Sequence, residues 1–199
     1  VWSQQTTPND VYNSSCGSAG ANCPPDNGPD HDFGSSALLV KTAAGRELLV
    51  AGQKSGVVYA LDPDQKGKVV WQTRVGKGGT NGGVQWGMAS DGQKVYAATS
   101  DVVRAPGGIG GAAAMGNAAL DPVQGGGLTA LRLEDGTKAW FVPGHPCDPP
   151  RAGCSPAQPG AVTAIPDIVF SGSMDGHLRA FTMGDGELVW DADTAKTYT

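Results

Sequence analysis

The sequence has no apolar run approaching the roughly 20 residues that a membrane-spanning helix requires. It also has no basic stripe, because 14 lysines and arginines face 19 acidic residues and the net charge is −5. Nowhere do cationic residues cluster among aromatic ones, and aromatic residues make up only 7% of the chain. These absences argue against a membrane span and against a nucleic-acid partner.

Turn-forming residues are abundant instead. The chain contains 31 glycines and 14 prolines, which favours many short strands over long helices. We therefore predict an all-β fold. Its strands are expected at 37–40, 47–52, 57–62, 68–73, 84–89, 94–100, 128–133, 162–165, 168–171, 177–181 and 187–190, and residues 1–12 are expected to begin as a strand.

A repeated motif organises these strands. It consists of an alanine, a glycine six residues later and a tryptophan ten residues later, with one extra turn residue in the first copy. The tryptophans are spaced by 69, 69 and 50 residues when Trp2 is counted as the end of a further copy, and these spacings are typical of propeller blades. The copies are Ala60, Gly67, Trp71; Ala130, Gly136, Trp140; and Ala180, Gly186, Trp190.

The motif resembles the tryptophan-docking motif of the eight-bladed quinoprotein dehydrogenases, which use pyrroloquinoline quinone (PQQ). The stretches QQTTPND, AGQKSGVVYALDP, GGVQWG and SGSMDGHLRAF are most similar to the polyvinyl-alcohol-dehydrogenase-like branch, and the resemblance covers nearly the whole chain. It implies an internal piece of a longer eight-bladed β-propeller with about three blades present. The approximate blades are 1–71, 72–140 and 141–199, with insertions at 13–29, 101–127 and 143–159.

Two of these insertions carry cysteine pairs. Cys16 with Cys23, and Cys147 with Cys154, are each separated by six residues in a loop. Local pairing into two disulfides is favoured, which indicates an oxidising compartment, either periplasmic or extracellular. The alternative is a zinc site in which His145 joins Cys147. The third insertion contains GGIGG and QGGG but lacks the helix, lysine and hydroxyl residue of a phosphate-binding loop.

The resemblance implies a catalytic aspartate. QTTPNDVYN begins the family signature that precedes it, but Asn13 stands where the family has the aspartate. The chain then inserts a cysteine loop and resumes with Asp30, His31 and Asp32, so the resemblance assigns the role of base and possible calcium ligand to Asp30. Two alternatives remain: Asp30 as an ordinary turn residue, and His31 as the general base.

Three further residues are candidates for PQQ binding. Lys54 lies six residues before Ala60 and matches the family's cation at that point, although a lone lysine in a turn is usually solvated. Gln85 and Trp86 resemble the family's GG-x-N-W, and the alternative for Trp86 is an aromatic residue that fills an inner strand.

The resemblance implies part of a PQQ- and calcium-dependent dehydrogenase. Its substrate would be a primary or secondary alcohol, small or polymeric, and its electrons would pass to a cytochrome c outside this chain. The piece alone is expected to be inactive, because other blades would complete the site. The alternative is a non-catalytic propeller that serves as an assembly scaffold in the cell envelope.

Overall fold

The computed structural model describes residues 1–18, 20–104 and 120–196, so residues 105–119 of the third insertion lie outside the described part. The described residues form three four-stranded antiparallel sheets and one short 3-10 helix, η1 (Cys16–Ser18), with no α-helix. None of their helical segments has the length and apolar character needed to cross a bilayer. The all-β expectation, with about three blades, is confirmed.

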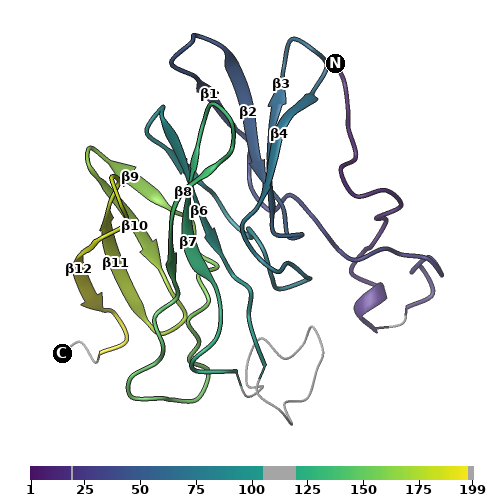
Figure 1. Cartoon of the computed structure of the whole chain (residues 1–199). Helices are drawn as coiled ribbons and strands as arrows, with labels where there is room; N and C mark the ends of the chain where they lie inside the picture. Colours follow the sequence, from purple (N-terminus) through teal and green to yellow (C-terminus); the bar gives the residue numbers. More distant parts are fainter. Residues whose placement is uncertain (19, 105–119, 197–199) are drawn as a thin grey trace.

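Each sheet is a simple up-and-down meander (Figure 1). Neighbouring strands in the sequence are neighbours in the sheet, and every pair is antiparallel. The first sheet contains β1 (Leu38–Lys41), β2 (Glu47–Gly52), β3 (Val57–Asp62) and β4 (Lys68–Arg74); the second contains β5 (Ala89–Ser90), β6 (Lys94–Thr99), β7 (Gly127–Arg132) and β8 (Lys138–Pro143); the third contains β9 (Thr163–Ile165), β10 (Ile168–Gly172), β11 (His177–Thr182) and β12 (Leu188–Asp193).

The repeated alanine and tryptophan face each other across the third and fourth strands of every sheet. The three pairs are in the same register, and each is followed by a bulge in the ladder. The bulge accommodates the turn that carries the motif glycine. The pairs are Ala60 with Trp71, Ala130 with Trp140, and Ala180 with Trp190.

The tryptophans of the first two sheets bridge to the next sheet. Trp71 Nε1 donates to Leu133 O at 3.0 Å, and Trp140 Nε1 donates to Met183 O at 3.1 Å. Each indole also lies against the motif glycine of the following sheet: a Cβ on Gly136 would be 2.5 Å from Trp71 Cε3. Only a residue without a side chain fits there.

Two apolar clusters fill the spaces between sheets. One joins the first and second sheets and includes Val50, Val58, Trp71, Val95 and Leu131. The other joins the second and third sheets, with Tyr96, Leu128, Val169 and Phe181 at its centre. The apolar faces of the sheets are therefore buried by packing against a neighbouring sheet, as stacked blades require.

Two strand predictions are wrong. Residues 84–88 do not pair with β6, because Val84 N donates to Gln53 O in the β2–β3 turn and the segment crosses between the sheets. Residues 1–12 form no strand, although Trp2 still packs on Gly67, where a Cβ would lie 2.2 Å from its Cζ3. Packing on the indole thus does not require a strand at that point.

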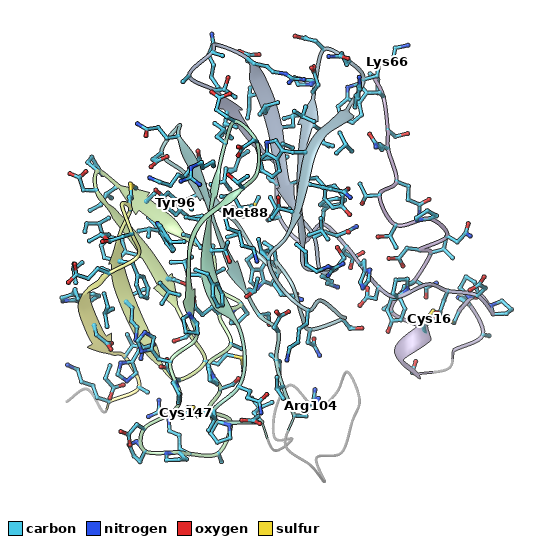
Figure 2. All side chains as sticks on the ribbon, viewed as in Figure 1. Cys16, Lys66, Met88, Tyr96, Arg104 and Cys147 are labelled. Carbon is cyan, nitrogen blue, oxygen red and sulfur yellow. A yellow bond between two sulfur atoms is a disulfide. The ribbon has the colours of Figure 1, made fainter. Side chains whose placement is uncertain are left out.

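The long connections gather at one end of the sheets. Cys16, Arg104 and Cys147 lie at that end, and Lys66 in the β3–β4 turn lies at the opposite one (Figure 2). Both predicted cysteine pairs are disulfides, Cys16–Cys23 and Cys147–Cys154. The zinc interpretation of Cys147 is therefore wrong, because a disulfide sulfur is not a thiolate ligand.

Candidate functional site

The turn between β2 and β3 places Lys54 at the end of the sheets that carries the long connections. Gly56 closes the turn with a φ of +81°, and its N–H donates to Gln53 O. Lys54 N donates to Asp32 O at 3.0 Å, while Lys54 O accepts from Gly79 N at 3.0 Å. These hydrogen bonds fix the backbone of Lys54 independently of the contacts that its side chain makes.

Lys54 bridges two carboxylates. Its Nζ lies 3.3 Å from Asp30 Oδ2 and 2.8 Å from Asp32 Oδ2. The side chains of Asp30 and Lys54 are mostly buried, at 9% and 16% exposure, whereas that of Asp32 is 63% exposed. One ammonium group thus serves one buried and one solvated carboxylate, 24 and 22 residues away in the sequence.

A third carboxylate holds the backbone of the segment that carries Asp30. Asp10 accepts the backbone N–H of Asp30 at 3.2 Å and that of His31 at 2.7 Å. Asp30 has a φ of +62°, in the left-handed region that few non-glycine residues adopt, although aspartate does so more often than most. The hydrogen bonds to Asp10 stabilise this conformation, and the sequence had suggested no role for Asp10.

The pKa values of the three ionisable groups are shifted from their ordinary values in different directions. Burial raises the pKa of the Asp30 carboxyl, and the Lys54 charge only partly opposes this. The hydrogen bond from Lys54 lowers the pKa of Asp32. Burial acts to lower the pKa of Lys54, but its bonds to Asp32 and Asp30 outweigh that effect and raise it. The arrangement therefore favours a protonated lysine beside a carboxylate that accepts a proton more readily than usual.

Gln85 and Trp86 lie on an adjacent cavity. The cavity has a volume of about 270 Å³, and its lining includes Asn81, Ser100, Arg104 and Met174 as well as this pair. Trp86 is 56% exposed, so it does not fill an inner strand. Gln85 Nε2 donates to Gly82 O at 2.8 Å and to Thr80 O at 3.3 Å, which fixes its amide against the local backbone.

The segment that carries Asp30 and Asp32 contacts the segment of Gln85 and Trp86 through backbone atoms. A Cβ on Gly34 would lie 2.2 Å from Gln85 O, so the segment that carries Asp30 and Asp32 packs directly against the Gln85 backbone. Among the described residues, no hydrogen bond joins the Gln85 side chain to Lys54 or to either aspartate. The structure therefore unites Lys54 with Asp30, and places Gln85 and Trp86 beside them rather than in the same cluster.

Two residues of the cavity were not predicted. Arg104 has a buried Nη1 without a hydrogen-bond partner among the described residues. Met174 lies in the β10–β11 turn, six residues before Ala180, as Lys54 lies six residues before Ala60. That shared offset was available in the sequence, whereas nothing near Arg104 repeats in the other sheets.

Within the described residues, no three histidine, cysteine or acidic side chains gather closely enough to hold a metal ion. Asp30 and Asp32 could contribute carboxylate oxygens, but Ca²⁺ takes about six to eight. These two aspartates alone thus do not complete a calcium site.

Comparisons with known proteins agree with this architecture. The PQQ_2 family model, described as outer membrane protein assembly factor BamB, matches residues 1–199. A polyvinylalcohol dehydrogenase of Pseudomonas sp. is 43% identical over 98% of this chain, and one of Sphingopyxis sp. (strain 113P3) is 37% identical over 97%. The chain spans 28% of the length of each.

Solved structures show the same fold. The quinohemoprotein alcohol dehydrogenase of Comamonas testosteroni matches with a TM-score of 0.53 and 17% identity, over 86% of this chain and 32% of that one. The quinohemoprotein alcohol dehydrogenase ADHIIG of Pseudomonas putida HK5 gives 0.52 and 15%, with the same coverage. At such identities the likeness concerns the fold alone.

Proposed function

The chain belongs to the PQQ_2 propeller family, and from this membership we propose that it is part of a PQQ-dependent alcohol dehydrogenase. The two curated relatives are named polyvinylalcohol dehydrogenase, which supports a primary or secondary alcohol, small or polymeric, as the substrate. The two disulfides support a periplasmic or extracellular location.

The residues of the candidate site fit PQQ, a flat quinone that bears carboxylate groups. The exposed indole of Trp86 offers a stacking surface, and the Nη1 of Arg104, which has no partner within the described part of the chain, suits a carboxylate. Lys54 offers an ammonium to the polar edge of the quinone. Because Gln85 Nε2 is already used, Gln85 would contact the cofactor through Oε1.

PQQ, when bound, supplies the oxidant that accepts two electrons from the alcohol. Asp30 takes the hydroxyl proton, for which its raised pKa is suited. Lys54 remains protonated and can donate to an anionic oxygen, while Asp10 keeps Asp30 oriented. The product is an aldehyde or ketone, and a cytochrome c outside this chain receives the electrons.

Calcium would bind beside Asp30, with further oxygen ligands from the cofactor and from outside the described residues. Because the residues of this chain would form only part of the calcium site and part of the PQQ site, residues 1–199 expressed alone are expected not to oxidise alcohols.

The exposed side of the last sheet supports the presence of further blades. Trp190 is 48% exposed, and no hydrogen bond from its Nε1 to a described residue is present, in contrast to Trp71 and Trp140. Leu188 and Val189 beside it are also exposed. We infer that another blade of the whole protein covers this surface and places its own turn glycine on Trp190.

The observation that carries the proposed function is the contact of Lys54 with Asp30 next to the Trp86 cavity. The test is to load the full-length protein with PQQ and Ca²⁺ and to measure dye-linked oxidation of polyvinyl alcohol and 2-propanol. Asp30→Asn should bind PQQ like the wild type but lose about 10² to 10⁴-fold in turnover. Asp64→Asn, at an exposed turn, is the matched control. Wild-type turnover in Asp30→Asn would overturn the assignment of the base.

A second candidate is a non-catalytic scaffold for cell-envelope assembly, which the description of the family model favours. The two candidates differ in cofactor binding. Titration of PQQ into the full-length protein with Ca²⁺ should quench tryptophan fluorescence if Trp86 stacks on the quinone, and Trp86→Leu should reduce this quenching. An absence of saturable PQQ binding would favour the scaffold.

A further inference from the structure

A groove separate from the candidate site runs between β4 of the first sheet and β8 of the second. We call it the rim groove; it has a volume of about 560 Å³. Its lining includes three cations, Arg74, Lys77 and Lys138, and one carboxylate, Asp101. This concentration of positive charge is unusual in a chain whose net charge is −5.

The three cations are available for an external partner. Within the described part of the chain, none of them forms a salt bridge to a carboxylate. Arg74 Nη1 is used by carbonyl oxygens, including Ser55 O at 2.6 Å, which orients the guanidinium without neutralising it.

The one carboxylate of the groove is already occupied. Asp101 accepts three backbone N–H groups, from Lys77 at 2.8 Å, Gly78 at 3.1 Å and Gly83 at 2.7 Å. Such amide contacts stabilise the negative charge and hold it toward the backbone. The rim groove therefore presents its cations to solvent with little internal compensation.

The groove also contains apolar surface. Phe141 is 50% exposed and Val123 is 61% exposed. An aromatic side chain beside cations is typical of protein interfaces, where it supplies contact area at low cost in conformational entropy. Small anions would make no use of these two side chains.

The cations are spread along the groove. Lys138 begins β8 and Pro143 ends it, which separates them by roughly 17 Å at about 3.4 Å per residue. Lys77 lies at the Pro143 end, because its N–H binds Asp101 just after Thr99, and Thr99 pairs with Gly127 opposite Pro143. A single small carboxylate cannot reach both ends, whereas an extended segment of about five residues can.

From this arrangement we propose that the rim groove binds an acidic segment of a partner protein. Carboxylates at both ends of the segment would meet Lys138 at one end and Arg74 and Lys77 at the other, and an apolar side chain between them would pack on Phe141. The proposal does not depend on PQQ binding or on alcohol oxidation.

The test uses the full-length protein and a fluorescein-labelled peptide of six glutamates with a central phenylalanine, followed by fluorescence anisotropy. The double variant Lys77→Glu, Lys138→Glu should bind the peptide about tenfold more weakly. The matched control is Lys41→Glu, Lys68→Glu, which makes the same change of charge at exposed positions outside the groove and should bind within about twofold of the wild type.

Two further measurements separate the alternatives. Phe141→Ser should weaken the peptide several-fold without changing the salt dependence of binding, since it removes apolar contact and no charge. Citrate should compete only at much higher concentration than an unlabelled peptide. Equal weakening in the groove and control variants, no peptide binding by the wild type, or equally effective competition by citrate would each overturn the proposal. Thermal unfolding of every variant excludes misfolding as the cause.

Discussion

Asp10 and Asp30 are 20 residues apart, yet the carboxylate of the first holds the backbone of the second in a left-handed conformation. The same carboxylate also binds His31 N at 2.7 Å. A hydrogen bond to a charged group contributes about 1.5–3 kcal/mol. These two hydrogen bonds should therefore stabilise mainly the segment that places Asp30 against Lys54.

We therefore expect Asp10→Ala to reduce alcohol oxidation about tenfold or more, because Asp30 loses its orientation. Unfolding in urea should show a loss of about 1–3 kcal/mol. Asp26→Ala, an exposed position in the same loop, is the control and should leave both quantities near wild type. Full activity in Asp10→Ala would show that the Asp30 backbone does not need this anchor.

The two aspartates that bind Lys54 should contribute to folding stability with opposite dependence on pH. The pKa of Asp32 is lowered in the fold, so its contribution to stability is present above the ordinary carboxyl pKa of about 4 and is lost as pH falls. The pKa of Asp30 is raised, so its contribution is present below about 4 and is lost as pH rises.

Accordingly, Asp32→Asn should lower the thermal midpoint at pH 7, whereas Asp30→Asn should raise it at pH 7 while losing about 10² to 10⁴-fold in turnover. Both differences from wild type should shrink at pH 3. Asp64→Asn controls for loss of an exposed charge. Destabilisation of both variants at pH 7 would show that burial does not dominate the environment of Asp30.

The contact of Gly136 with Trp71 predicts a selective cost of adding a methyl group. Gly136→Ala places a Cβ against the indole at a φ of +72°. Gly92→Ala is the matched control, because its φ is +84° but no atom lies within 4 Å. The left-handed backbone should cost about 1–2 kcal/mol in each variant, and overpacking about 1–3 kcal/mol more in Gly136→Ala alone. Urea unfolding measures both, and equal losses would mean that the indole moves aside freely.

Trp190 provides a test for further blades. In the full-length protein, Trp190→Ala should cost about 3–5 kcal/mol, as Trp140→Ala should, because both indoles would be buried between sheets. Chemical denaturation of both variants measures these costs. A loss below about 1 kcal/mol for Trp190→Ala would indicate that its face stays in solvent.

The repeat made the architecture predictable, because tryptophans ten or eleven residues after an alanine mark a strand pairing that recurs in all three described sheets. Lys54 could be placed by the same arithmetic, since its offset from Ala60 fixes it in the turn. The path of residues 84–88 could not be predicted, because its alternation of apolar and polar residues suits a strand while a bond from Val84 to Gln53 diverts it. Arg104 was missed for a related reason: a buried Nη1 without a hydrogen-bond partner among the described residues leaves no periodic pattern in the sequence.

The segregation of the two ends of the sheets has an evolutionary consequence. The glycine turn at Lys66 lies at one end, whereas Cys16, Arg104 and Cys147 lie at the other. A loop can therefore lengthen, acquire a disulfide or be exchanged without disturbing the contacts by which blades recognise each other. Proteins of this family can therefore acquire new chemistry through changes in their loops, while the tryptophan and glycine contacts that hold the blades together are inherited unchanged.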